Sequence, residues 1–144
     1  MPPFDDLGST TSGRELTTVR GCDPMFKVMM LLKRKPGLSL EEFIERYEGE
    51  HVPLVEKYAT RITHYTRHYL HPASHVVHGD LVAEPEYDVI TELWYDDREA
   101  FFEQQESLRG RPEAIAAVVA DEEAIFDRPK SRTVFVEDHV SNLR

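Results

Sequence analysis

The sequence predicts an α+β fold of the ferredoxin-like βαββαβ type. Two observations carry this prediction. Helical periodicity appears in two separate stretches, 40–58 and 98–126, and segments rich in β-branched and aromatic residues lie on both sides of each stretch. The chain has 144 residues, which is enough for one such domain and a tail.

The first half of the predicted domain contains the clearest periodic signal. A strand is predicted at 26–33, where the centre of the segment is apolar on both faces. Ser39 can cap the helix that follows. Pro53 interrupts that helix, so we expect a kink or break near 49–52 and a second short helix that opens at Pro53. The helical face is formed by Leu40, Phe43, Ile44, Tyr47, His51, Leu54, Val55 and Tyr58.

Turn residues divide the second half of the chain. Strands are predicted at 63–71, 87–95 and 133–140, with a long loop at 72–86. Helical segments are predicted at 98–108 and from Pro112 onward, with a separate last turn at 121–126. Residues 1–24 show no helical or strand period, so we expect an N-terminal arm outside a domain of residues 25–144.

Composition excludes several classes of partner. The 17 basic and 27 acidic residues give a net charge of −10, so neither nucleic acid nor an anionic membrane surface is expected as a partner. No apolar run is long enough to cross a membrane, and the N-terminus lacks the layout of a signal peptide. Cys22 is the only cysteine, which excludes an intrachain disulfide and fits a cytoplasmic protein.

Cofactor and metal motifs are missing from the sequence. It has no glycine-rich phosphate loop, no nucleophile elbow and no HxH, HExxH or facial-triad spacing. We therefore expect no metal and no cofactor.

The predicted sheet needs cover on both sides. The strands at 26–33 and 87–95 are apolar on both faces, whereas two helices can cover only one face of the sheet. We expect a homodimer that pairs two sheets into a dimeric α+β barrel. The alternative is a monomer in which residues 1–24 cover the second face.

His51 is the strongest single candidate for chemistry. It lies on the apolar face of the first helix, next to Pro53, and a histidine suits acid–base work near neutral pH. The competing interpretation is a core histidine bound to a backbone carbonyl that Pro53 leaves free.

The strands supply candidate partners for His51. On the strand at 63–71, residues 64, 66 and 68 share one face and residues 65, 67, 69 and 71 the other. Glu92 and Trp94 share a face of the strand at 87–95. If Glu92 faces the helices, it is desolvated, keeps its proton and can act as a catalytic acid. If it faces solvent, it has no catalytic role. The expected catalytic residues are His51, Tyr65 and Glu92, and the expected substrate-binding residues are Tyr47, His68, Tyr69, Trp94 and His139.

The stretch LLKRKPGLSLEEFIERYEGEHVPLV (31–55) resembles the opening of EthD-domain proteins. HYTRHYL (64–70), YDVITELWYDD (87–97) and TVFVEDHV (133–140) look like the remaining strands of that family. The resemblance maps the family's His-x-Pro histidine onto His51 and its strand tryptophan onto Trp94. Tyr47 stands where the family pattern usually has Trp.

The resemblance implies a subunit that dimerises into an α+β barrel and binds small organic compounds. It suggests a cofactor-independent lyase or isomerase, dehydratase- or cyclase-like, that acts on an aromatic or polyketide-like carbonyl compound. In this picture His51 moves a proton next to the carbonyl, and Tyr65 or Tyr69 holds the oxygen. A non-catalytic binding protein of a degradation pathway is the alternative. Because the wider superfamily includes haem proteins, haem bound through His51 is a third possibility.

Overall fold

The computed structural model describes residues 25–74, 77 and 84–144. The expected arm at 1–24 and most of the loop at 72–86 lie outside the described residues. Four strands form one antiparallel sheet in the order β2-β3-β1-β4. Their bounds are β1 Phe26–Leu32, β2 His64–Tyr69, β3 Val89–Tyr95 and β4 Arg132–Phe135.

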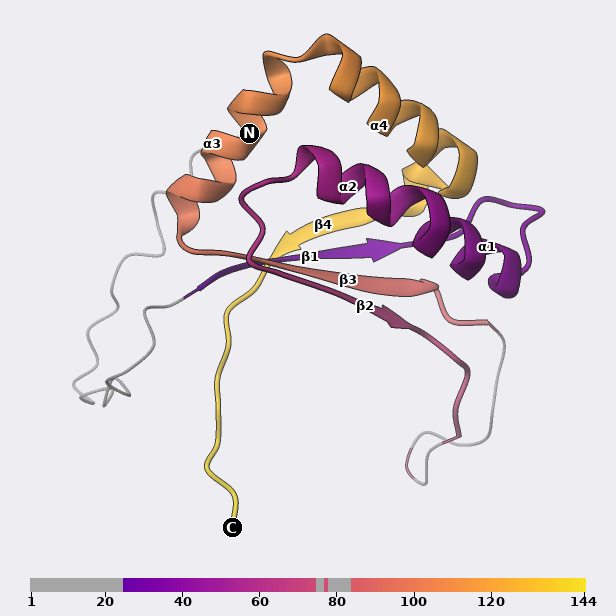
Figure 1. Cartoon of the computed structure of the whole chain (residues 1–144). Coiled ribbons are helices and arrows are strands. Elements are labelled where there is room, and N and C mark those ends of the chain that lie inside the picture. The colour runs from indigo at the N-terminus through magenta and orange to yellow at the C-terminus, as the bar shows by residue number, and fades with distance from the viewer. Residues whose placement is uncertain (1–24, 75–76, 78–83) are drawn as a thin grey trace.

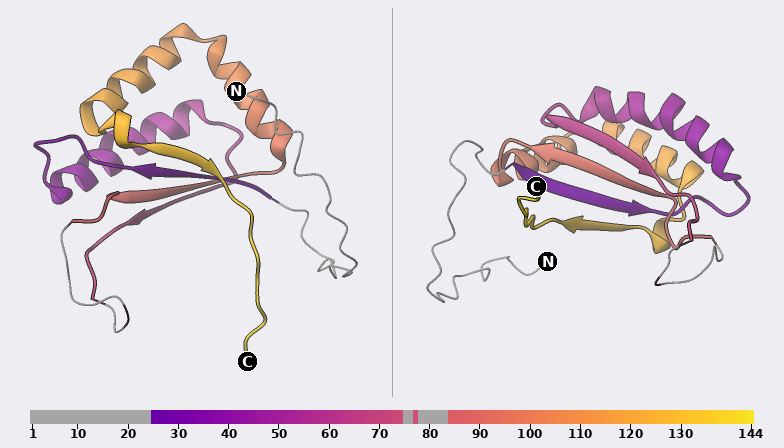
Figure 2. Two further views of the ribbon diagram at one scale, coloured as in Figure 1. Left: turned by 180° about the vertical axis from the view of Figure 1, so that it is seen from behind. Right: turned by 90° about the horizontal axis from the view of Figure 1, so that it is seen from below.

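The helices all lie on one face of this sheet (Figure 1). Views from behind and from below show the same two layers, and no helix of the described residues lies on the second face of the sheet, called the helix-free face below (Figure 2). The helices are α1 Leu40–Arg46, the π-helix η1 Tyr47–His51, α2 Val52–Tyr58, α3 Arg98–Arg109, α4 Pro112–Ile125 and the short 3₁₀-helix η2 Arg128–Lys130. This order confirms the predicted ferredoxin-like βαββαβ fold.

Local sequence signals start the helices where expected. The Ser39 hydroxyl accepts a hydrogen bond of 3.1 Å from the Glu42 backbone N–H, and Glu41 and Glu42 place negative charge in the first turn. Asp97 caps α3 by accepting a 2.7 Å bond from the Ala100 N–H. No helix in the described part of the chain is long and apolar enough to cross a membrane.

Alternation along β3 determines what each sheet face presents. Val89, Thr91, Leu93 and Tyr95 are buried under the helices, and the residues between them face the other side. The main core cluster joins α1, η1, the end of α4 and the sheet. Its buried members are Leu32, Phe43, Tyr47, Val52, Val89, Ile125 and Phe126.

Two predicted boundaries differ from the structure. The turn predicted at 121–126 is part of α4, because residues 113–125 contain neither proline nor glycine to end the helix. The last strand stops at Phe135 rather than at residue 140. Its only neighbour is β1, which it pairs with over Val28–Leu31, and the chain beyond Val136 has no strand beside it among the described residues.

Candidate active site

His51 ends the π-helical turn η1. Pro53 follows two residues later and has no N–H, so it cannot make the α-helical bond to the carbonyl four residues before it. The chain widens into a π turn and restarts as α2, with Pro53 in the first turn. The interruption predicted at 49–52 is therefore confirmed. Such turns within helices occur often at functional sites.

The partner of the His51 imidazole is Asp121 on α4, whose carboxylate contacts Nδ1. Because a carboxylate only accepts hydrogen bonds, Nδ1 carries the proton. In the neutral ring, Nε2 then holds the free lone pair. A carboxylate that fixes the tautomer and direction of an imidazole is the arrangement found behind general bases in acyl-transfer enzymes.

Aromatic rings fix the position of the imidazole. The centroid of the His51 ring lies 4.8 Å from that of Tyr47 and 5.3 Å from that of Phe126, both with edge contacts. Only 6% of His51 is exposed. The ring is thus held between aromatic neighbours and largely shielded from solvent.

Nε2 of His51 has no hydrogen-bond partner among the described residues, whereas Nδ1 has Asp121. Over the same residues, Arg111 Nε is the one fully buried side-chain nitrogen or oxygen without a partner. The unpartnered Nε2 is therefore not one of the fully buried atoms.

Glu122 lies next to Asp121 on α4. Burial raises the pKa of Glu122 above its usual value, against the opposing effects of the Arg128 and His51 charges. The Arg128 guanidinium lies 3.5 Å from the Glu122 carboxylate.

A tyrosine network occupies the space between η1 and the sheet. Tyr47 Oη and Thr91 Oγ1 share a 2.6 Å hydrogen bond, and Tyr65 Oη donates to Tyr47 Oη at 3.4 Å. Burial raises the pKa of both Tyr47 and Tyr65, so both hydroxyls remain protonated at neutral pH. Tyr47 thus packs against the sheet, where the sequence suggested partners for His51. His51 itself contacts α4 instead.

Beside this network, β2 carries an ion pair with the π turn. Arg67 donates from Nε to Glu48 Oε1 at 3.0 Å and from Nη2 to Glu48 Oε2 at 2.6 Å. Tyr69 Oη donates to the same Oε1 at 2.7 Å. The Arg67 hydrogen bonds hold the pKa of Glu48 below its usual value. Sequence reasoning missed both Glu48 and Arg67.

The remaining strand candidates lie on the opposite face of the sheet. Trp94 Nε1 donates to Glu92 Oε1 at 2.7 Å, and His68 Nε2 lies 3.2 Å from Glu92 Oε2. His64 stacks on Trp94 with ring centroids 4.3 Å apart, and Lys27 Nζ lies 4.4 Å from the centroid of the indole ring.

Glu92 does not face the helices, where it would be desolvated and protonated, but the opposite side of the sheet. The indole N–H of Trp94, with help from His68, holds the pKa of Glu92 below its usual value. Glu92 is therefore ionised at neutral pH rather than protonated. His139 lies beyond β4, exposed, with Nε2 at 2.6 Å from Glu137 Oε1. None of His68, Glu92 and His139 reaches His51.

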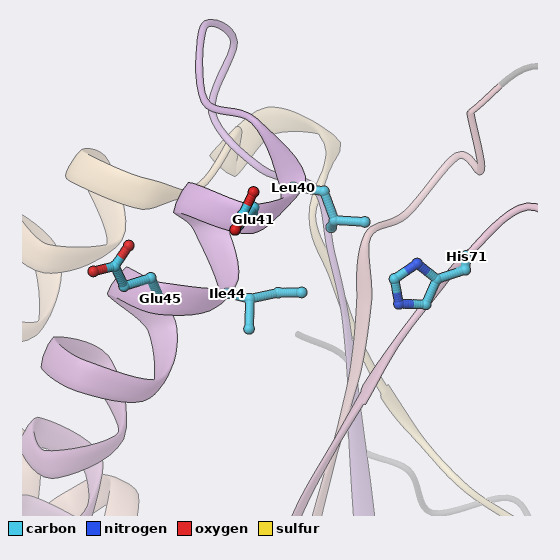
Figure 3. Close-up of a pocket in the computed structure, with 5 residues that line it drawn as sticks. All are labelled: Leu40, Glu41, Ile44, Glu45 and His71. Carbon is cyan, nitrogen blue, oxygen red and sulfur yellow. The ribbon is translucent and has the colours of Figure 1, made fainter.

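A groove of about 570 Å³ lies between α1 and the chain that follows β2. Leu40 and Ile44 point from α1 toward His71, whereas Glu45 points away from it (Figure 3). Glu41 completes the lining. The groove is mainly apolar, and it does not include His51.

The fold has counterparts among solved structures. An EthD family protein from Bacillus halodurans matches at a TM-score of 0.56 with 19% identity, over 81% of this chain and 100% of that one. A protein from Arabidopsis thaliana matches at 0.53 with 18% identity, over 82% and 99%. A protein from Bacteroides fragilis, described as dimeric with a ferredoxin-like fold, matches at 0.48 with 14% identity, over 79% and 96%.

Because the sequence identities are this low, the matches to the first two structures support the ferredoxin-like fold and nothing about function. No functionally curated protein matches the chain. The model of the EthD domain matches residues 35–129, which include α1, η1, α2, α3 and α4 and the strands β2 and β3. Because this match spans well over half of the 144 residues, the chain belongs to the EthD-domain family.

Proposed function

We propose that this protein is a cofactor-independent enzyme that moves a proton on an aromatic or polyketide-like carbonyl compound, in a lyase or isomerase reaction. The observation that supports it is the buried contact of His51 Nδ1 with the Asp121 carboxylate, which leaves Nε2 as an oriented base. The tyrosine hydroxyls beside His51 supply neutral hydrogen-bond donors.

The reaction begins when Nε2 takes the proton from the carbon next to the carbonyl. The electron pair of that C–H bond forms a C=C bond to the carbonyl carbon, and the C=O π pair moves to the oxygen, which accepts a hydrogen bond from Tyr65 or Tyr69. In an isomerase, the carbonyl re-forms as the imidazolium returns the proton to another carbon. In a dehydratase-type lyase, the carbonyl re-forms, the enolate electron pair makes the Cα=Cβ bond, and the β-carbon–oxygen bond breaks as the imidazolium protonates the hydroxyl, which leaves as water. Asp121 stabilises the imidazolium throughout.

The proton-removal step can be tested without knowing the product. We expect the protein to catalyse exchange of α-protons for deuterium in D₂O on some members of a panel of aryl ketones and aryl 1,3-diketones, followed by proton NMR. His51→Gln should lower the rate by roughly 10²–10⁴-fold. Asp121→Asn should lower it by a smaller factor.

His139→Gln is the matched control, because His139 also contacts a carboxylate but lies exposed beyond β4. It should leave the exchange rate unchanged. Exchange at the same rate in His51→Gln and wild type would overturn the proposal.

A second candidate function, binding without catalysis, is supported by the groove between α1 and His71, which is apolar and does not include His51. It predicts that ligands raise the melting temperature of wild type and His51→Gln equally, with no exchange in either. The exchange assay separates the two candidates.

We also infer that two copies pair through the helix-free face of the sheet. That face carries Met29, Leu31, Ile90 and Trp94 beside its polar groups, and Val134 is 39% exposed. A second copy would cover these side chains. Light scattering that shows a stable monomer at micromolar concentration would overturn this inference.

A further inference from the structure

Three donors converge on one carboxylate at the edge of the helix layer. Arg67 Nε and Nη2 and the Tyr69 hydroxyl all donate to Glu48, at 3.0, 2.6 and 2.7 Å. The Arg67 guanidinium also lies over the Tyr65 ring, 4.6 Å from its centroid. A planar guanidinium held by stacking and aided by a hydroxyl is the donor set that proteins use to bind a carboxylate in bidentate fashion.

Glu48 is the more exposed and more replaceable partner in this arrangement. Its side chain is 38% exposed, whereas that of Arg67 is 22% exposed. Glu48 lies in the π turn, where the chain already departs from α-helical bonding. Glu48 can therefore turn out into water, where its charge is solvated, whereas stacking on the Tyr65 ring keeps Arg67 in place.

The apolar groove lies along α1, just before the π turn that carries Glu48. Ile44 lies one helical turn before Glu48, and His71 comes two residues after Tyr69, the last residue of β2. Fully extended, the four residues from Arg67 to His71 span roughly 13–14 Å, which bounds the distance between the two positions. Leu40 and Ile44 point toward His71 (Figure 3).

We propose that the Arg67–Tyr69 pair is a binding site for the carboxylate of an apolar organic acid, and that Glu48 occupies it when no ligand is bound. The ligand carboxylate replaces Glu48 on the same three donors, and its apolar body lies in the groove between Leu40, Ile44 and His71. The inference concerns ligand binding alone: because the groove does not include His51, it holds whether or not the proposed reaction occurs.

The test compares the affinities of the protein for a carboxylic acid and for the corresponding uncharged amide. Titration calorimetry on the full chain uses 4-biphenylacetate and 4-biphenylacetamide, which have the same apolar body. Wild type should bind the acid more tightly than the amide. Glu48→Gln should raise acid affinity by roughly tenfold, because the neutral side chain competes less well for Arg67, and should leave amide affinity unchanged.

Two changes at Arg67 and one matched control complete the design. Arg67→Gln should remove the preference for the acid. Arg67→Lys keeps the charge but not the planar fork, and should lose most of that preference with the fold intact by circular dichroism. Glu103→Gln breaks the exposed Arg61–Glu103 pair, whose atoms lie 2.9 Å apart, and should change neither affinity.

The inference is overturned if Glu48→Gln fails to raise acid affinity relative to amide affinity, or if Arg67→Lys binds the acid as wild type does. His51→Gln should keep the full acid preference, because His51 does not touch the carboxylate donors. A variant that loses exchange activity but keeps the acid preference would therefore test only the role of His51. A variant that loses the acid preference but keeps exchange activity would test only the role of Arg67.

Discussion

The two faces of the sheet carry similar side chains in different settings. Both combine aromatic rings, a histidine and a carboxylate. On the helix side, the histidine and carboxylate are His51 and Asp121, and the helix layer covers them. The helix-free side holds His68 and Glu92, with half of the His68 side chain exposed. The two carboxylates are similarly covered, so the comparison teaches that cover of the histidine separates an oriented base from a surface ion pair.

Carboxylate titration also differs between the two sides of the sheet. Glu122, behind the helix side, has a raised pKa because burial disfavours its charge. Glu92, on the other face, has a lowered pKa because the Trp94 indole and His68 bind its charged form. The two carboxylates should therefore respond to pH with opposite sign.

The largest expected effect is on the helix side. Phe43 is fully buried and contacts the rings of Tyr47, Tyr69 and Phe126. Phe43→Ala should lower the free energy of unfolding by about 3–5 kcal/mol, as measured by urea denaturation. Leu31→Ala, on the other face, should cost about 1 kcal/mol in monomeric protein. Equal losses would contradict the distinction between the faces.

The next effect concerns association. Trp94 lies at the centre of the polar cluster on the helix-free face, with His64, Lys27 and Glu92 around it. Trp94→Ala should weaken the proposed dimer at least roughly tenfold in Kd by sedimentation equilibrium. Tyr65→Phe, on the helix side, should leave the Kd unchanged. A stronger effect from Tyr65→Phe than from Trp94→Ala would reverse our assignment of the interface.

A smaller, stabilising effect is expected in the π turn. Gly49 has no positive φ, and a Cβ built there meets nothing within 4 Å. Gly49→Ala should raise the free energy of unfolding by about 0.5–1 kcal/mol, because alanine loses less backbone entropy. Thermal unfolding followed by circular dichroism measures it. A lower melting temperature would mean that the turn needs glycine for another reason.

The smallest expected effect is the pH response of the two glutamates. A raised folded pKa means that Glu122 lowers stability at neutral pH and that this cost disappears as pH falls through the folded pKa. Glu122→Gln should therefore raise the melting temperature slightly at pH 7 and less at pH 4.

Glu92 should show the opposite sign. Its lowered folded pKa adds stability above the unfolded pKa, and this is lost as pH falls through the folded value. Glu92→Gln should therefore lower the melting temperature at pH 7 and make less difference in acid. Melting curves that move in the same direction for both variants would refute the proposed electrostatics.

The fold was largely predictable because its signals are local. Ser39, Pro53 and Asp97 start or interrupt helices through backbone hydrogen bonds, which depend on neighbouring residues alone. Alternation also predicted correctly that Tyr65 and Tyr69 share one face of β2, opposite His64 and His68.

The site was less predictable because it depends on contacts between distant elements. The strands are apolar on both sides, so the sequence could not say which face of β3 meets the helices, and Glu92 proved to be on the other one. Asp121 was missed because the turn predicted at 121–126 separates it from the helix that carries it. Its signal is the acidic run Asp121, Glu122 and Glu123 after the apolar residues 114–120.

The central claim is that Asp121 orients His51 with Nδ1 protonated and Nε2 free. Long-range ¹H–¹⁵N NMR on the ¹⁵N-labelled chain tests it directly, because the two ring nitrogens of a neutral imidazole differ in shift. We predict an Nδ1–H tautomer for His51 in wild type, and loss of this preference in Asp121→Ala. A neutral His51 protonated on Nε2 in wild type would contradict the account.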